Sequence, residues 1–404
     1  MLKLISLGEL RGIMRELREE FYFRRGLEKV PIGEALGREL TEDVRAMEAS
    51  PRRHTASFDG YALRAEDSRS YPLRVTGRIY AGETGEAVLR KGEAAAIATG
   101  AYLPGGTDTV LRLEDARLEG ELLYGLPLEP WTKVVMAGSN YKGGEVVLRN
   151  GERVRPQEVG ILAGLGLEEV TVYKRPRVAV FSTGDEICRG VLRDTNGPMA
   201  MAFLREWGCD PVFLGSVPDD LEGLKAKLLE GARYDAVVTS GGVSVGEKDY
   251  LLKALGEVGR VILHKVKTRP GKPLAVGIVG DKPVFSLPGK PTGAFVALEL
   301  GVRSYFLGDL GRPIARAKLG GEIRLSTKDT DAPDTVNILF VLRRDGTAIP
   351  MGYEGSPIVL VPRGGLYNVS SIASSLRAAV ADGYVVAQRD LKKGEEVEVN
   401  LLQG

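Results

Sequence analysis

The most constraining feature of the sequence is an apolar strand that runs directly into a glycine turn. Residues 235–239, Asp-Ala-Val-Val-Thr, form a short β-branched run that predicts a strand covered on both faces in a parallel sheet. Ser240, Gly241 and Gly242 follow at once. Glycine accepts backbone angles closed to other residues, so peptide N–H groups can converge there on a phosphate. The stretch favours an anion-binding loop, but an ordinary strand-to-helix turn fits it equally well.

Two further turns strengthen the anion-binding interpretation. Residues 269–273 read Arg-Pro-Gly-Lys-Pro, and residues 287–291 read Leu-Pro-Gly-Lys-Pro. Proline fixes φ and glycine permits the bend, so each turn should hold a lysine on a stiff backbone. Strands are expected between the turns, and the second turn enters a predicted helix over 292–307, whose N-terminus favours a negative group. Together the turns predict a site for a phosphorylated or otherwise anionic ligand.

The segments SGGVSVGEKD, RPGKP and LPGKP resemble, in order and spacing, motifs of the molybdopterin molybdenumtransferase family, which includes the MoeA proteins and the gephyrin E domain. Residues 59–62, DGYA, and residues 99–108, TGAYLPGGTD, also resemble motifs of that family. The resemblance implies insertion of molybdate or tungstate into adenylylated molybdopterin (molybdopterin-AMP), with Mg²⁺ and release of AMP. It also implies a homodimer with the active site between the subunits.

Residue chemistry and the resemblance together assign the candidate site residues. Catalytic roles are expected for Asp59, Thr99, Glu186, Asp249, Lys265 and Arg269. Substrate-binding roles are expected for Ser240, Gly241, Gly242, Ser244, Lys272, Pro288, Lys290 and Pro291. Carboxylates suited to Mg²⁺ are Glu186, Asp219, Asp220 and Asp249. The cations would neutralise phosphate or molybdate oxygens, although Lys265 and Asp220 taken alone also fit solvated surface charges.

Four positions depart from the family pattern. Phe58 stands where the family has methionine or valine, Val146 where it has aspartate, Arg269 where lysine is commoner, and Lys290 where asparagine is commoner. Glu145 is the candidate substitute for the carboxylate missing at Val146. The additional cation of Lys290 suggests tighter anion binding or an altered choice between molybdate and tungstate.

The length and element pattern predict an α/β multidomain protein. Residues 174–312 alternate strands and helices, as in a doubly wound sheet, whose ligands bind beyond the carboxyl ends of the strands. This segment is the expected molybdopterin-binding domain. The other expected parts are an extended helical and strand linking region (1–45 with 140–173, including helices over 7–17 and 31–40), a small β-containing lid domain (46–139) and a C-terminal β-barrel-like domain (313–404).

Composition narrows the classes of partner. The net charge of +1 gives no sign of a nucleic-acid or membrane partner. No run of about 18 apolar residues occurs and the N-terminus is charged too early for a signal peptide, so a soluble, cytoplasmic protein with a small-molecule substrate is expected. Two alternatives stay open. A related molybdopterin adenylyltransferase would consume ATP, and a non-catalytic cofactor-binding scaffold would bind a stoichiometric partner without releasing AMP.

Overall fold

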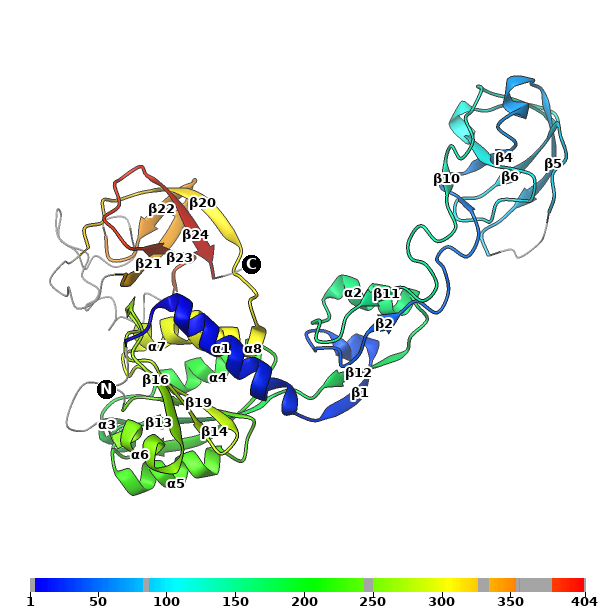
Figure 1. Cartoon of the computed structure of the whole chain (residues 1–404). Coiled ribbons are helices and arrows are strands. Elements are labelled where there is room, and N and C mark those ends of the chain that lie inside the picture. The colour runs from blue at the N-terminus through cyan, green and yellow to red at the C-terminus, as the bar shows by residue number, and fades with distance from the viewer. Residues whose placement is uncertain are drawn as a thin grey trace. The chain divides into compact units, whose positions relative to one another are not determined.

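The chain folds as two compact units, residues 1–26 with 173–404 and residues 27–172. The computed structural model describes residues 4–82, 87–242, 250–325, 334–353, 356 and 380–402. The N-terminal helix α1 (Leu7–Phe21), blue in Figure 1, belongs to the same unit as the C-terminal part of the chain. The smaller unit is therefore an insertion in the sequence of the larger one.

The larger unit is built around a mixed six-stranded sheet. Its strands, in spatial order, are β14 (Asp210–Val217), β13 (Arg177–Thr183), β15 (Ala236–Ser240), β19 (Lys282–Leu287), β18 (Ala275–Val279) and β16 (Arg260–His264). The first four run parallel, which confirms the βαβ interpretation, whereas β18 and β16 are antiparallel additions. The antiparallel edge arises because a tight turn at Gly280, with φ +63°, joins β18 directly to β19.

Helices cover both faces of this sheet, as a doubly wound fold requires. One face packs against α5 (Leu221–Gly231) and α6 (Tyr250–Val258). The other face packs against α1, α4 (Asn196–Glu206), α7 (Pro291–Ala297) and α8 (Arg303–Leu307). A π-helical segment, Leu298–Val302, connects α7 to α8 without a break, so the helix predicted over 292–307 is confirmed with a local widening.

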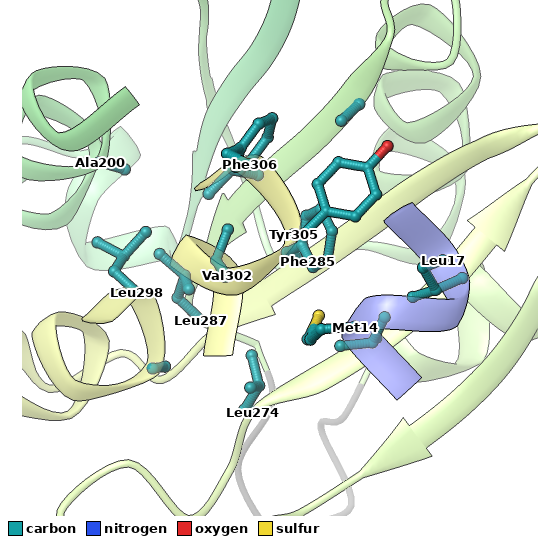
Figure 2. Close-up of a cluster of buried hydrophobic side chains, with 14 of the residues drawn as sticks. Met14, Leu17, Ala200, Leu274, Phe285, Leu287, Leu298, Val302, Tyr305 and Phe306 are labelled. Carbon is teal, nitrogen blue, oxygen red and sulfur yellow. The ribbon is translucent and has the colours of Figure 1, made fainter. Parts of the chain in front are cut away.

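The first helix is amphipathic, as its sequence spacing predicted. Ser6 caps it: the Ser6 Oγ accepts from the N–H of Glu9, and the Glu9 carboxylate accepts from the N–H of Ser6. Met14 and Leu17 are buried in the cluster that contains Phe285 and Tyr305 (Figure 2). Burying side chains of this size contributes about 1.5–3 kcal/mol each, so α1 is a structural part of the larger unit.

The C-terminal part of the larger unit is a closed five-stranded barrel, which confirms the barrel-like prediction. The ring runs β21, β22, β20, β24, β23 and back to β21, and the short β17 adds to β21. The strands are β17 (Thr268–Arg269), β20 (Ile314–Leu319), β21 (Val336–Arg344), β22 (Thr347–Pro350), β23 (Gly383–Ala387) and β24 (Glu396–Leu401). Near the barrel, the buried Glu299 of the π segment accepts two 2.8 Å hydrogen bonds from Arg312.

The smaller unit contains two sets of paired strands. In the first, β1 (Leu27–Pro31) pairs with β12 (Glu169–Tyr173) and β2 (Val44–Arg45) pairs with β11 (Val146–Leu148), and α2 (Pro156–Gly164) shares their core. The helix expected over 31–40 is wrong: only a 3₁₀ turn, Ile32–Ala35, forms. Pro31 is taken up by β1, and Gly33 and Gly37 weaken a helix at this point.

The second set is the small β region. Its six-stranded sheet has, in spatial order, β7 (Thr109–Arg112), β4 (Gly60–Leu63), β6 (Glu93–Ile97), β5 (Leu73–Ile79), β9 (Leu122–Tyr124) and β8 (Arg117–Glu119). A separate pair consists of β3 (Thr55–Ala56) and β10 (Val134–Val135). Among the described residues of both units, no helix is long and apolar enough to cross a membrane.

Candidate functional site

A pocket of about 430 Å³ lies at the carboxyl ends of parallel strands in the larger unit. Its lining begins at the last residue of β13, Thr183, and includes residues that directly follow β15 and β19. This is the edge at which ligands bind in doubly wound sheets. The lining residues are Thr183, Gly184, Glu186, Asp219, Gly241, Gly242, Thr268, Arg269, Pro270, Gly271, Lys272, Pro273, Pro288, Gly289, Lys290 and Gly293.

The three turns singled out in the sequence meet in this pocket. A methyl group on Gly241, whose φ is +90°, would lie 2.6 Å from the Thr183 Oγ1, so only glycine allows this approach between β15 and β13. A Cβ on Gly289 would lie 3.7 Å from the Gly241 Cα, and a Cβ on Gly293 would lie 3.7 Å from the Gly271 N. The glycines therefore let the backbone of the three turns approach closely at the pocket wall.

Three cations line the pocket, and a fourth predicted cation does not. Arg269, Lys272 and Lys290 are lining residues from the 269–273 and 287–291 turns. Lys265 is absent from the described lining. It adopts a left-handed φ of +79°, and its N–H donates to the Leu274 carbonyl at 2.9 Å. The two Pro-Gly-Lys-Pro turns thus supply the positive charge of this site.

Two carboxylates face the same pocket. Glu186, in the short helix α3 (Asp185–Cys188), folds over the turn, so that a methyl group on Gly184 would lie 2.6 Å from the Glu186 Oε1. Asp219 follows β14, and its N–H donates to the Asp185 Oδ1 at 3.3 Å. Desolvation, and after it the charges of Asp185, Asp219 and Glu186, raise the pKa of the Cys188 thiol, as expected beside a negative cluster.

The remaining predicted carboxylates have other positions. Asp220 caps α5, because its Oδ1 accepts the N–H of Gly223 at 2.7 Å, and it does not contribute to the described pocket lining. Asp249 and Ser244 lie outside the described residues. Within the described ranges, no group of three or more His, Cys, Asp or Glu side chains is arranged to hold a metal ion. Glu186 and Asp219 nevertheless fit Mg²⁺, which commonly takes one or two carboxylates together with substrate phosphates and waters.

Ser240 and Pro291 support the pocket from behind its wall. Ser240, the last residue of β15, is buried, and its hydroxyl donates to the Ser182 Oγ at 3.4 Å. Pro291 is the first residue of α7, where its missing N–H costs nothing. Gly242 and Pro288 reach the lining itself. The predicted substrate-binding residues that the structure describes are therefore either at the wall or directly beneath it.

Asp59 and Thr99 form a small constellation of their own in the smaller unit. The Asp59 Oδ1 accepts hydrogen bonds from the Thr99 N at 2.7 Å and from the Thr99 Oγ1 at 3.0 Å. The backbone N–H contributes most, and these bonds lower the pKa of Asp59. The carboxylate is therefore exposed, and Thr99 orients it and favours its ionised form.

Sequence reasoning missed a polar network behind the pocket, made by Ser182, Asp194 and Asn196. Asp194 accepts hydrogen bonds from the Ser182 hydroxyl and from the N–H groups of Asn196 and Gly197. The Asn196 side chain donates to carbonyls of the 287–291 turn. The only signal was Asp-Thr-Asn before a predicted helix, which indicates a cap but not a contact with residues some 90 positions away.

Comparison with known proteins gives one consistent family. Residues 5–166 match the MoeA N-terminal region (domain I and II), and residues 179–307 match a probable molybdopterin-binding domain. A molybdopterin molybdenumtransferase of Haemophilus influenzae is 34% identical over 304 residues, covering 72% of this chain and 74% of that protein. Gephyrin of Dictyostelium discoideum is 32% identical, covering 68% of this chain and 45% of gephyrin. One crystal structure of a molybdopterin biosynthesis MoeA protein from Pyrococcus horikoshii is 31% identical with a TM-score of 0.72, and the match covers both chains fully. A second is 25% identical with a TM-score of 0.76, and the match covers 99% of this chain and 100% of that chain.

Proposed function

This chain belongs to the molybdopterin molybdenumtransferase family, and we propose that it inserts molybdate or tungstate into adenylylated molybdopterin with release of AMP. Its place is in the biosynthesis of the molybdenum cofactor. The observation that carries the finer proposal is the pocket, in which three cations and two carboxylates surround glycine turns. Such a pocket suits a phosphate-bearing ligand and an oxyanion bound beside it.

The cations would bind and orient the anionic groups. Arg269 presents a planar guanidinium that can make paired hydrogen bonds to phosphate or molybdate oxygens, whereas Lys272 and Lys290 act as point charges on stiff turns. Positive charge held in place stabilises the negative charge that develops on the leaving phosphate. Proline restricts the backbone of both turns, which limits the rearrangement that these residues need to do so.

Glu186 and Asp219 would hold Mg²⁺ beside the substrate phosphates. A bound Mg²⁺ would neutralise phosphate charge during AMP release. The donor chemistry, and not a preformed cage, supports the assignment of magnesium.

Asp59 and Thr99 would act on a substrate held by a second copy of the chain. In the proposed homodimer, each active site would receive Asp59 of the partner subunit and Thr99 of the partner subunit. Their pre-oriented carboxylate, with its lowered pKa, supports this role. Light scattering of the purified protein tests the dimer. Mixing Asp59→Asn chains with Glu186→Gln chains tests the shared site, because a shared site would regain activity in the mixed dimer.

The division into a linking region, a lid, a molybdopterin-binding domain and a C-terminal barrel is part of the same proposal, with boundaries near residues 45, 139, 173 and 312. Limited proteolysis followed by mass spectrometry should cut near these positions. A cytoplasmic location also belongs to the proposal, and fractionation of the source cells tests it.

The decisive experiment measures AMP released from adenylylated molybdopterin in the presence of Mg²⁺, with molybdate, with tungstate and with neither. Release that depends on an oxyanion is the expected result, and the preferred oxyanion follows from the comparison. ATP supplied with molybdopterin serves as the control for adenylyl transfer. Absence of release with either oxyanion, under conditions where the substrate binds, would refute the proposed function.

A further inference from the structure

Asn196 lies behind the pocket and contacts the 287–291 turn. We propose that Asn196 is a positioning residue: its amide holds this turn in the conformation that presents Gly289 and Lys290 to the pocket, and so sets the affinity for anionic ligands. The role in affinity rests on the proposed function, whereas the role in holding the turn does not. Asn196 is 5% exposed and is the first residue of α4.

The geometry of the amide is specific. The Asn196 Nδ2 donates to the Gly289 carbonyl at 2.8 Å and to the Pro288 carbonyl at 3.3 Å. Two carbonyls facing the same atom fix the orientation of the side-chain amide, because the Oδ1 could not occupy that place without repulsion. One side chain therefore fixes two successive peptide planes of the turn.

The orientation of these two peptide planes determines which backbone groups of the turn point away from Asn196. The peptides following Pro288 and Gly289 are trans, so each N–H points opposite to the carbonyl of the preceding residue. The N–H groups of Gly289 and Lys290 therefore point away from Asn196. Neither N–H donates to an acceptor in the described part of the chain, and both residues line the pocket. Asn196 thus controls two unpaired donors and the backbone that carries the Lys290 ammonium.

Asn196 is itself held in place by Asp194. The Asp194 Oδ1 accepts from the N–H of Asn196 at 3.1 Å and of Gly197 at 2.9 Å, which caps α4 in place of Thr195. The Asp194 Oδ2 accepts from the Ser182 hydroxyl of β13 at 2.5 Å. A methyl group on Gly197 would lie 2.4 Å from that Oδ2. The network ties the 287–291 turn, through Asn196 and Asp194, to the central sheet.

The same network continues to the glycine turn. Ser240 donates to Ser182, and the Gly241 N–H donates to the Leu287 carbonyl at 3.1 Å, so both pocket turns depend on one set of hydrogen bonds. The buried Oδ1 of Asn196 has no donor among the residues that the structure describes. A buried acceptor without a donor costs stability. The contribution of the Asn196 amide therefore comes from its two Nδ2 hydrogen bonds to the turn.

The test compares full-length Asn196→Ala and Asn196→Asp with the native protein and with Asn400→Ala. Asn400 is the control, because its Nδ2 also donates to a backbone carbonyl, that of Tyr384 at 3.4 Å, but in the barrel. The first readout is hydrogen exchange of the Gly241 and Ala294 amides, which donate to Leu287 and Lys290 carbonyls. The second is calorimetric affinity for AMP with Mg²⁺ and for molybdate.

Asn196→Ala should speed hydrogen exchange at both amides and weaken the binding of both probes about tenfold. A tenfold loss is the effect expected from the loss of about one hydrogen bond. Asn196→Asp should be worse at neutral pH, because a carboxylate would face two carbonyls, and should recover as falling pH protonates it into a donor. Asn400→Ala should change neither local exchange nor affinity.

Native exchange and affinity in Asn196→Ala would overturn the positioning role, as would equal effects of Asn196→Ala and Asn400→Ala. If Asn196→Ala does not fold, the isosteric Asn196→Asp decides, since an affinity independent of pH would contradict the inference. If the native protein binds neither AMP nor molybdate, the proposed function fails, and the exchange of Gly241 and Ala294 then decides the positioning role alone.

Discussion

Replacing Lys290 by asparagine should change stability and ligand binding in opposite directions. Lys290 occupies the N-cap of α7 with φ −74° and ψ 132°, an extended conformation suited to a cap. Its side chain makes no cap hydrogen bond to any described residue, and the next residue, Pro291, has no N–H to satisfy. An asparagine in the same conformation can accept from the N–H of Gly293, the third residue of the helix.

The two magnitudes follow from this geometry. An asparagine cap typically contributes about 1 kcal/mol, so the free energy of unfolding of the variant should be about 1 kcal/mol higher than that of the native protein. A hydrogen bond to a charged group contributes about 1.5–3 kcal/mol. Because Lys290 is exposed to solvent and therefore screened, we expect the lower value, about 1.5 kcal/mol, which is roughly a tenfold loss of affinity for an anionic ligand.

Lys290→Ala is the matched control, because it removes the charge without adding a cap. Denaturant unfolding measures the stability of both variants, and calorimetry with AMP and with molybdate at low and high salt measures their binding. Both variants should bind about equally weakly, and only Lys290→Asn should gain stability. Equal stability of the two variants would refute the cap, and native affinity in both would remove Lys290 from the ligand site.

Three other perturbations test separate features. Thr99→Val should raise the pKa of Asp59 only part of the way toward its ordinary value, because the larger contribution, from the backbone N–H, remains. The stability that the lowered pKa contributes is present at neutral pH and is lost as the pH falls through that pKa. A carbon-13 titration of the Asp59 carboxyl measures the change in pKa. Glu299→Ala should lower the free energy of unfolding by up to about 3–5 kcal/mol, because it leaves the largely buried Arg312 with only the exposed Glu206, at 3.6 Å, as a counter-charge. Gly241→Ala should cost about 1–3 kcal/mol in backbone strain alone and close part of the pocket, which denaturation and AMP binding measure.

Each of these three perturbations has a control variant or an outcome that would contradict the prediction. Gly120→Ala tests backbone strain without a clash, since Gly120 has φ +61° and no atom within 4 Å of an added Cβ; an equal loss of AMP affinity in both glycine variants would contradict the steric argument. Glu169→Ala removes an exposed pair with Lys29 and should cost under about 1 kcal/mol. A loss at Glu299 no larger than at Glu169 would show that burial adds nothing, and an unchanged Asp59 pKa in Thr99→Val would remove the hydroxyl from its cause.

Local pattern was sufficient to predict the pocket, because its main parts are short motifs with strong backbone preferences. Glycine and proline have backbone preferences that indicate turns from sequence alone. The turns around Gly241, Lys272 and Lys290 could therefore be placed at strand ends before their contacts were known. The βαβ rhythm then predicted that strand ends share one edge of a sheet. Convergence of the turns followed from both facts together.

The features that sequence pattern missed depend on contacts distant in the chain. Asn196 binds carbonyls some 90 residues later, and nothing in its neighbourhood reports this. Asp220 was weighed as a metal ligand and as an ordinary surface charge, and the structure shows it capping α5, a role that depends on where a helix begins. The strands expected between the two Pro-Gly-Lys-Pro turns are β18 and β19. The antiparallel direction of β16 was missed, because a hairpin and a crossover place equally apolar strands in a sheet.

The burial of α1 against late parts of the chain bears on how the protein emerges from the ribosome. Met14 and Leu17 leave the exit tunnel early, but Phe285 and Tyr305, in the same cluster, are made some 270 to 290 residues afterwards (Figure 2). At about 5–20 residues per second the apolar face of α1 waits roughly 15–60 s for these partners. During that interval residues 27–172 can complete their own cores. The apolar face of α1 therefore stays without its partners in the nascent chain after residues 27–172 can have folded.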